Sequence, residues 1–410
     1  MSEPKPSLGE LPRWQGGRTA MVGCAVAGAA GLALTAVGYA FDARRTMLSY
    51  LVAFLYFLGL SLGMLALNMA QYAARARWHI VLRRAIEVVH APLPVFVVLF
   101  IPIALTAKRI YVWIDPPASL GKEVLENLEW KHGYLNFPGF LWRAVVYFAV
   151  WLVVSELLYR HSIAQDEDGA SHWTASNRRW GSAGLPLVAI ATTFASFDWL
   201  MSLNPTWFST LFGVYFITGF FLASLALLVL ILTAARGPGH IGALVAKPHF
   251  HNLGKLLLAF VAFWGYIAFS QYMLMYHANL PEEVPWFLVR THGPWKPVSM
   301  LLVLGHFVLP FFALLSRDLK LHPRALSVVA CWLLFIHFVD LVWLVMPSAP
   351  LHDLGSRWAP VGFVLPWTIL PAMIGVGGIW AAFALWRLRG NYLVPIGDPY
   401  LEDSLRYVQP

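Results

Sequence analysis

Two aspartates stand inside long apolar stretches of the sequence, and each is followed seven residues later by a proline: Asp198 in FDWLMSLNP and Asp340 in VDLVWLVMP. A charge at the centre of a bilayer costs about 3 kcal/mol on insertion scales, so such residues usually face a bundle interior and mark a pathway. Buried carboxyl and imidazole groups have pKa values that can move towards neutrality. Proton transfer within the membrane is therefore the first chemistry that the sequence suggests.

Further ionisable residues could extend Asp340 into a path. His337 lies three residues before Asp340, so the two share a helix face, and His306 falls at a similar depth on the preceding apolar stretch. The predicted ladder, from the inner side outwards, is Lys255, His306 with His337, Asp340, and Tyr276 with His277. The structural alternative is that these groups tie helices together by hydrogen bonds. For Asp340 with His337 we favour the proton path.

Around Asp198 the sequence offers one counter-charge. Arg143 lies at a similar outer depth on the preceding span and is the best candidate partner for Asp198. Glu156 stands at the inner end of the same span as Arg143, and Glu87 and His90 stand at the inner end of the span before it. These three either belong to the path or simply reach the lipid headgroups, and both interpretations stay open.

The elements that position these residues are membrane helices. Of the 410 residues, 59% are hydrophobic and 12% are charged, whereas soluble domains carry about a quarter charged residues. Apolar runs of about 20 residues recur, long enough to cross a bilayer as helices, and unpaired backbone groups are not tolerated in lipid. We predict an all-α integral membrane protein. Its ten expected spans are 20–41, 47–71, 86–106, 138–159, 183–203, 207–233, 253–276, 298–315, 325–346 and 361–386.

The shared Asp and Pro spacing of Asp198 and Asp340 also suggests an internal repeat. The two aspartates lie four spans apart, and four spans preserve direction, so the repeat would be parallel. We therefore expect two four-helix bundles, helices two to five (47–203) and helices six to nine (207–346). The remaining expected parts are an N-terminal segment (1–19), peripheral helices (20–41 and 361–386) and a C-terminal tail (387–410).

Charge in the loops predicts the orientation. The loops on the side of both termini hold twice as many Lys and Arg residues as the other loops, and the positive-inside rule places them in the cytoplasm. The net charge of +8 lies in these short loops and gives no sign of a nucleic-acid partner. On the outer side, Leu120, Val124, Leu125 and Leu128 predict a short amphipathic helix that could support a docked partner.

Cofactor ligands are scarce. The only two cysteines lie far apart in apolar runs, which excludes a CxxCH haem site and a cluster held by four thiolates. His306 and His337 could be axial ligands of one b-type haem, an alternative that stays open. His249-x-His251 resembles half of a metal site, but no third ligand is near, so a surface position is expected. We predict no metal and no cofactor bound by this chain.

Four consecutive blocks carry a resemblance to a known family. They are FDWLMSLNPTWFSTLFGVYF (197–216), FSQYMLMYHANLPEEVPWFLVR (269–290), GHFVLPFFALLSRDLK (305–320) and HFVDLVWLVMP (337–347). Together they resemble the ActF subunits of bacterial alternative complex III, which are similar to the wider family of polysulfide-reductase membrane subunits, also called NrfD-like. The blocks run from the fifth to the ninth expected span, and the ten-span layout fits the whole chain.

The resemblance implies a respiratory role in the bacterial inner (cytoplasmic) membrane. The chain would be a non-catalytic subunit of a complex that oxidises quinol and passes electrons to cytochrome c or directly to a terminal oxidase. Implied partners are a homologous ten-span subunit, an iron–sulfur protein and periplasmic c-type cytochromes, which would carry the haems and iron–sulfur clusters, together with membrane lipid. Chains of this kind are often described as quinone-binding, and Asp198 with the nearby outer ends of helices three and four is the only candidate position for a quinone.

Two other function classes remain open. A stand-alone ion-coupled secondary transporter would also show repeats and charges near the midplane. No pair of glycine- or proline-broken helices is apparent at corresponding positions of the two halves, which disfavours it. A haem-b electron carrier is the other alternative.

Overall fold

The computed structural model describes residues 13–117, 120–235, 244–281, 283–348, 362–363 and 365–408, without the side chain of residue 123. In this part of the chain every regular element is a helix. Ten helical segments are long and apolar enough to cross a membrane. The predicted all-α membrane fold with ten spans is therefore confirmed, and it suits a bilayer because helices satisfy their own backbone hydrogen bonds.

Six spans are single helices and four are composite, because a 3₁₀ turn at 346–348 extends the ninth span beyond its α-helix. The first five spans are α1 (Arg18–Phe41), α2 (Ala43–Ala73), a third span of η2 (Ile80–Leu82), α3 (Arg83–His90) and α4 (Val95–Leu105), then α7 (Phe137–Asp168), and α8 (Ser171–Trp199) continued by η3 (Met201–Leu203). The next three are α9 (Phe212–Ala234), α10 (Lys247–Ala278) and an eighth span of η5 (Gly293–Trp295), α12 (Lys296–Leu302), η6 (Val303–Val308) and α13 (Leu309–Leu315). The last two spans contain α15 (Pro323–Val345) and α16 (Ile369–Leu388). The connections carry α5 (Ala107–Ile110), α6 (Lys122–Lys131), α11 (Val284–Thr291) and α14 (Arg317–Leu321), and the tail carries α17 (Leu401–Leu405).

Several helices differ from the apolar runs that predicted them. α8 begins at Ser171 instead of residue 183, because the polar stretch 171–182 continues the helix beyond its apolar part. α7 likewise runs on to Asp168 and ends where Gly169 adopts φ 65°, a left-handed conformation that glycine enters at little cost. α9 begins at Phe212 rather than 207. α16 begins at Ile369, and residue 361 lies outside the described residues.

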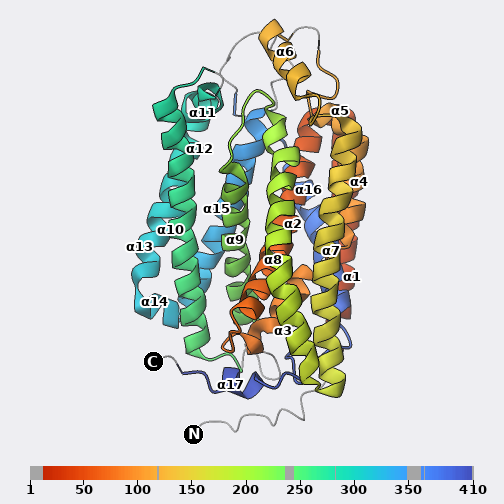
Figure 1. Ribbon diagram of the computed structural model, residues 1–410, viewed down its shortest axis with the longest axis vertical. Coiled ribbons are helices and arrows are strands. Elements are labelled where there is room, and N and C mark those ends of the chain that lie inside the picture. The colour runs from red at the N-terminus through yellow and green to blue at the C-terminus, as the bar shows by residue number, and fades with distance from the viewer. Residues whose placement is uncertain are drawn as a thin grey trace.

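α2 and α9 pack together in the middle of the molecule (Figure 1). Two glycines of α2 permit a close approach. A Cβ atom added at Gly59 would lie 2.8 Å from the Cβ of Phe220, and one at Gly63 would lie 2.1 Å from the Oγ of Ser224. Ser224 Oγ also donates a hydrogen bond to the carbonyl oxygen of Leu60 at 3.0 Å. Small residues commonly mark such helix contacts in membranes, and Gly59 and Gly63 are residues of this kind.

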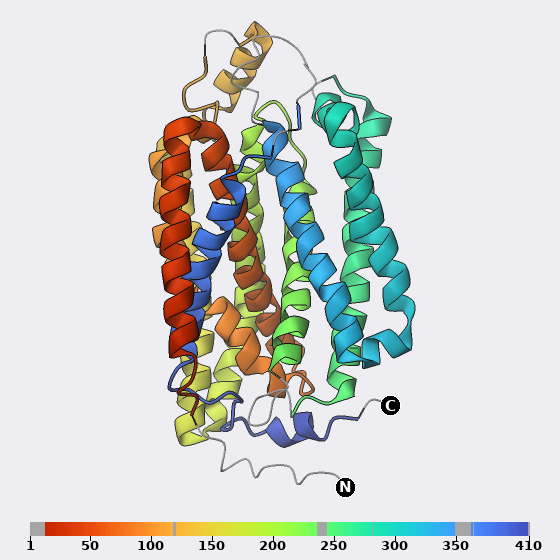
Figure 2. The same cartoon turned by 180° about the vertical axis from the view of Figure 1, so that it is seen from behind.

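The first and last spans, α1 and α16, lie side by side (Figure 2). A Cβ atom added at Gly31 would lie 2.5 Å from the backbone nitrogen of Gly375. One added at Gly378 would lie 2.6 Å from the backbone nitrogen of Gly28. The two backbones therefore touch directly, and a larger residue at these positions would push the helices apart.

The other contacts join the helices into one continuous assembly. α7 packs on α8, and α2 packs on α3, α4 and α8. α9 packs on α10 and α15, and the eighth span contacts both α10 and α15. The helices of the two predicted bundles are not separate, because α2 contacts α9 and α15, and α8 contacts α9. The division into bundles at 47–203 and 207–346 stays a prediction.

Both ends of the described chain lie at the same end of the molecule, here called the terminal end (Figure 1). The segment after α16 crosses this end and includes α17. The backbone N–H of Trp14 donates to the carbonyl of Asn391 at 2.9 Å, and that of Gly390 donates to the carbonyl of Trp14 at 2.9 Å. These bonds tie the N-terminal segment to the tail. The shared end agrees with an even number of spans.

At the opposite end, the predicted amphipathic helix is present as α6. Leu128 is buried, and Leu120 and Val124 pack against the core. Lys131 Nζ donates to the carbonyl of Pro205 at 2.6 Å, which fixes α6 to the turn before α9. Trp130 is 85% exposed. α6 therefore covers this end of the protein with its apolar face and presents the other face outwards.

Candidate functional site

Asp198 is completely buried near the end of α8 and is held by two side chains of α7. Arg143 Nε donates to Oδ2 at 2.8 Å, and Arg143 Nη2 donates to Oδ1 at 2.9 Å. Tyr147 Oη donates to Oδ2 at 2.7 Å. The predicted pairing of Arg143 with Asp198 is confirmed, and its two parallel bonds are the strong form of an arginine–carboxylate contact. We call Asp198, Arg143 and Tyr147 the Asp198 site.

The arginine of this site faces outwards and the aspartate faces inwards. The Arg143 side chain is 20% exposed, and its guanidinium carbon lies 4.0 Å from the ring centre of Tyr134, a cation–π contact. Burial, followed by the nearby charge of Asp198, raises the pKa of Tyr134 to about 12. Tyr134 therefore stays a neutral hydrogen-bonding phenol near physiological pH.

The surroundings of Asp198 leave it poorly suited to hold a quinone. Its two carboxylate oxygens already accept three hydrogen bonds. The neighbouring Trp199 ring packs against other aromatic rings, with centre distances of 5.1 Å to Phe100 and 5.8 Å to Phe54. A quinone that approached this region would meet the partly exposed Arg143 before Asp198. Quinone binding stays a prediction.

Asp340 on α15 lies in a different environment. It is 1% exposed, and Tyr215 Oη of α9 donates to its Oδ1 at 2.5 Å. Within the described residues Asp340 forms no ion pair. A Cβ atom added at Gly219 of α9 would lie 3.7 Å from Oδ2 of Asp340 and 3.3 Å from Cε1 of His337. Gly219 thus leaves room on the side of Asp340 that faces His337.

Two buried histidines lie beside Asp340. The ring centres of His337 and His306 are 6.4 Å apart, and His306 packs on the ring of Trp264 at 3.9 Å. Both nitrogens of both imidazole rings are buried and have no hydrogen-bond partner among the described residues. Buried polar atoms are nearly always satisfied, so these nitrogens require a water or another ligand. We call Asp340, Tyr215, His337 and His306 the Asp340 site.

The backbone around His306 departs from the α-helix. Residues 303–308 form a π-helical segment, η6, which the sequence analysis did not predict. Pro310 has no N–H to donate to the carbonyl of His306, so one α-helical hydrogen bond is lost at this point. Single π-helical turns inside α-helices often occur at functional sites. Here the wider turn presents His306 to the bundle interior, where it is 0% exposed.

Only some residues of the predicted proton path lie close together in the structure. Asp340, His337 and His306 lie together, as their depths predict. Lys255 is exposed on α10, and Tyr276 (69% exposed) and His277 are exposed at its other end. These three side chains therefore lie outside the interior that holds Asp340. Their part in proton transfer stays a prediction without support from this geometry.

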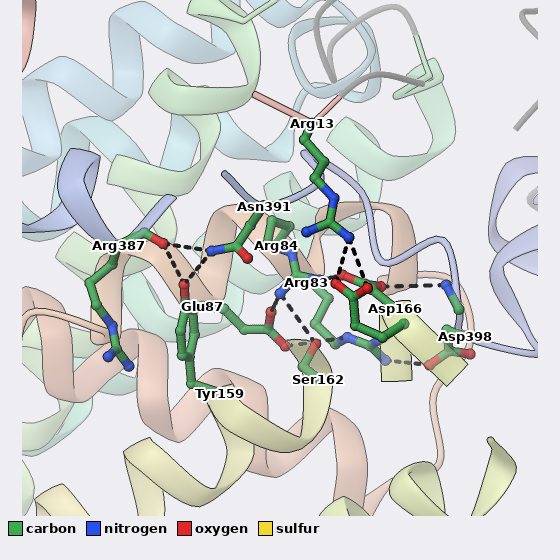
Figure 3. A network of polar contacts seen from close by, with 12 residues as sticks. Arg13, Arg83, Arg84, Glu87, Tyr159, Ser162, Asp166, Arg387, Asn391 and Asp398 are labelled. Atoms are coloured by element: carbon green, nitrogen blue, oxygen red, sulfur yellow. Dashed lines mark hydrogen bonds and ion pairs between the residues drawn. The ribbon is translucent and has the colours of Figure 1, made fainter. Parts of the chain in front are cut away.

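A third group of charges is buried at the terminal end (Figure 3), and we call it the terminal-end network. Arg84 Nη1 donates to Glu87 Oε2 at 2.8 Å, and Arg84 also pairs with Asp166 of α7. Arg83 pairs with Asp398 of the tail and lies 3.4 Å from Glu87, measured from Nε to Oε1. These five side chains are at most 2% exposed. Paired charges of this kind are costly to break, because the remaining partner stays buried and uncompensated.

The headgroup interpretation of Glu87 and His90 is wrong. Glu87 lies inside the terminal-end network, and His90 is 0% exposed. His90 Nδ1 lies 2.8 Å from Ser155 Oγ, and Asn68 Nδ2 lies 3.2 Å from His90 Nε2. The amide nitrogen of Asn68 can only donate, so Nε2 accepts and, in the neutral ring, Nδ1 carries the proton. The tail reaches the terminal-end network through Asp398, which pairs with Arg83, and a hydropathy pattern could not show that contact.

Sequence reasoning missed several functional neighbours. Arg83 and Arg84 were counted as loop charges, although their spacing to Glu87, four and three residues, is the spacing of helix ion pairs. Tyr147 and Tyr215 gave no signal beyond their aromatic character, since their partners lie on other helices.

Glu156 lies at the terminal end and is half-buried. It accepts from Arg160 Nε at 2.6 Å and from Arg387 Nη2 of α16 at 2.6 Å. It is thus joined to α16 and not to the Asp198 site. Its part in a proton path stays a prediction.

His249, part of the predicted metal half-site, does not lie at the surface as expected. His249 is 0% exposed, and its Nε2 lies 3.1 Å from the carbonyl oxygen of Ser404 in the tail. The expected surface position of His249 is therefore wrong, because the tail covers it. Among the described residues, no group of three or more His, Cys, Asp or Glu side chains could hold a metal ion.

No protein-family model and no curated protein matches the chain.

Proposed function

We propose that this chain is a non-catalytic membrane subunit of a quinol-oxidising respiratory complex of the alternative complex III type, in which it forms scaffold and a path for protons. In this proposal it lies in the bacterial inner membrane with both termini in the cytoplasm. Its partners are a related ten-span subunit, an iron–sulfur protein and c-type cytochromes, which carry the redox cofactors. The family part of the proposal rests on the four sequence blocks between residues 197 and 347.

The observation that carries the proton path is the Asp340 site. Asp340 is buried, accepts a hydrogen bond from Tyr215 and forms no ion pair within the described residues. Burial of a carboxyl group disfavours its charged form, and a proton is the simplest partner that can neutralise it. The ring nitrogens of the neighbouring His337 and His306 have no hydrogen-bond partner among the described residues, and imidazole nitrogens can accept and donate protons through water.

The geometry gives each residue of the site a distinct task. Tyr215 fixes one oxygen of Asp340 through its 2.5 Å hydrogen bond. The other oxygen faces the space beside Gly219 and His337. In the proposal this second oxygen exchanges a proton with the histidine pair. Quinol oxidation in a partner subunit would change the protonation of the site.

The test of the family assignment is purification of the tagged full chain from its own membranes in gentle detergent, followed by mass spectrometry. We expect recovery of a multihaem cytochrome, an iron–sulfur protein and a related ten-span subunit. A chain recovered alone or only with copies of itself would overturn the respiratory assignment. The absorption spectrum of that isolated chain would also test the haem-b alternative.

The transporter alternative has less support in the geometry. The third span is broken between α3 and α4, where Pro92 and Pro94 interrupt the helix. Its counterpart in the predicted repeat is α10, which continues unbroken from Lys247 to Ala278. Transporters of the inverted-repeat kind carry broken helices at matching positions of both halves.

A further inference from the structure

A pocket of about 560 Å³ lies at the terminal end between α7 and α16. Its charged lining consists of Arg160, Arg387 and Arg389 against a single acid, Glu156. The pocket is therefore rich in positive charge. It is separate from the Asp340 site, which lies on other helices.

Some guanidinium N–H groups of this pocket have no hydrogen-bond partner among the described residues. Glu156 accepts one hydrogen bond from Arg160 and one from Arg387. The Nε of Arg387 is buried and has no hydrogen-bond partner among the described residues. The side chain of Arg389 is exposed and makes no hydrogen bond or ion pair within the described part of the chain. Guanidinium N–H groups thus remain available for an anion, and their planar fork suits phosphate.

The pocket walls are held in a defined shape. Tyr159 Oη donates to the carbonyl of Arg387 at 2.6 Å, and Asn391 Nδ2 donates to the same carbonyl at 2.8 Å (Figure 3). The guanidinium carbon of Arg387 also lies 4.2 Å from the ring centre of Tyr159. These contacts fix the end of α16 against α7 before any ligand arrives, which lowers the entropic cost of binding.

The pocket lies where the apolar part of α16 ends, close to the expected surface of the membrane. α16 runs as an apolar span to its end at Leu388, so Arg387 and Arg389 mark the level where its apolar part ends. Trp386, which also lines the pocket, is 55% exposed. Tryptophan is enriched at membrane–water interfaces, where its ring sits at headgroup level. The pocket therefore opens at the depth of phospholipid phosphates.

We propose that this pocket binds the phosphate of one anionic phospholipid from the adjacent leaflet, with Arg160, Arg387 and Arg389 as its donors. The acyl chains of that lipid would lie along the apolar surface beside Trp386. Basic pockets between membrane helices are a recognised form of anionic lipid site. The bound lipid would bridge α7 and α16 at the terminal end. This inference does not depend on the proposed respiratory function.

The experiment is native mass spectrometry of the full chain in detergent, titrated with phosphatidylglycerol and, separately, with phosphatidylcholine. The pocket variant combines Arg160→Gln and Arg389→Gln, which removes two donors and leaves the Arg387 contacts to α7 in place. We expect this variant to bind phosphatidylglycerol about thirty-fold more weakly. The matched control, Arg317→Gln with Arg406→Gln, removes two exposed arginines elsewhere at the terminal end and should leave the affinity unchanged.

A second variant predicts a change in the opposite direction. Glu156→Gln removes the one acid of the pocket, so phosphatidylglycerol should bind about five-fold more tightly. Equal binding by the pocket variant and the wild-type chain would overturn the proposal, as would equal loss in the control or equal affinity for phosphatidylcholine. Displacement of the lipid by millimolar glycerol phosphate would instead assign the pocket to a free phosphate and overturn the lipid.

Discussion

Asp198 and Asp340 occupy equivalent sequence contexts, yet the structure surrounds them differently. Asp198 is neutralised by two hydrogen bonds from Arg143 and receives a third from Tyr147. Asp340 receives a hydrogen bond from Tyr215 and forms no ion pair among the described residues. A buried carboxylate with a fixed counter-cation has little reason to change its charge, whereas one without a cation can be neutralised by a proton. In the proposed function, the comparison separates a structural ion pair at Asp198 from a site at Asp340 that exchanges protons.

The second half of the chain does contain a buried arginine, but it serves another purpose. Arg290 is 1% exposed and donates to the carbonyls of Trp343 and Leu344 at 3.2 and 3.0 Å. Its guanidinium carbon lies 3.7 Å from the ring centre of Trp286. Burial lowers the pKa of Arg290 to about 9. The Arg290 guanidinium thus binds the carbonyl groups near the end of α15, and Asp340 accepts its hydrogen bond from Tyr215.

The largest expected effect is the loss of the cation from the Asp198 site. Arg143→Gln leaves Asp198 buried without a counter-charge, which should destabilise the protein by about 3–5 kcal/mol. Thermal unfolding of the purified chain in detergent measures this change. The control is Arg143→Gln with Asp198→Asn, which removes both charges and should recover much of the loss. An unfolding midpoint of Arg143→Gln equal to that of the wild type would remove the contrast between the two sites.

The next effect tests whether the paired buried charges at the terminal end behave like Asp198. Asp398→Asn takes one partner from Arg83 in the terminal-end network, and we expect a loss of about 2–3 kcal/mol, since Glu87 remains nearby. Asp403→Asn is the matched control. Asp403 pairs with Arg77, and both side chains are about half exposed, at 49% and 57%, so little change is expected. Similar losses in both variants would contradict the distinction between buried and exposed pairs.

His79 tests how a buried imidazole responds to protons. Burial, and then the charge of Arg83, lowers the pKa of His79 to about 3. Between pH 6.5 and 3 the unfolded chain binds a proton at this residue and the folded chain does not. Stability should therefore fall as the pH decreases through this window, by about 1.4 kcal/mol per pH unit. His79→Gln should reduce the slope of unfolding free energy against pH, and an unchanged slope would count against this account.

The smallest effect concerns the hydrogen bond that distinguishes the Asp340 site. Tyr215→Phe removes the 2.5 Å hydrogen bond to Asp340 and should cost about 1–2 kcal/mol in unfolding free energy. Tyr276→Phe is the matched control, because Tyr276 is 69% exposed. Denaturant unfolding of both variants in detergent measures the difference. If both lose the same amount, the bond from Tyr215 contributes nothing specific.

Much of the fold could be predicted because hydropathy directly reports membrane spans. The pairing of Arg143 with Asp198 could also be predicted, since both lie at one depth on consecutive spans. The rotation of α10 could not be predicted, because its middle stretch, residues 256–269, is apolar on all sides and does not show which face turns inwards. Lys255 and His277 are therefore exposed, contrary to the interior path expected for them.

The remaining misses come from long-range contacts. Asp340 accepts a hydrogen bond from Tyr215, which lies far earlier in the sequence, and Arg83 pairs with Asp398 in the tail. The positive-inside rule treats arginines such as Arg83 as solvated loop charges. It cannot detect that the tail crosses the terminal end and buries them. The π-helical turn at His306 likewise depends on the local loss of a hydrogen bond before Pro310.

The most direct measurement is proton translocation by the purified complex in liposomes during quinol oxidation, with Asp340→Asn and Asp198→Asn compared with the wild type. We expect Asp340→Asn to assemble and oxidise quinol but to translocate far fewer protons per electron, because an amide cannot exchange a proton at this site. A wild-type proton yield in Asp340→Asn would show that Asp340 is not part of the path.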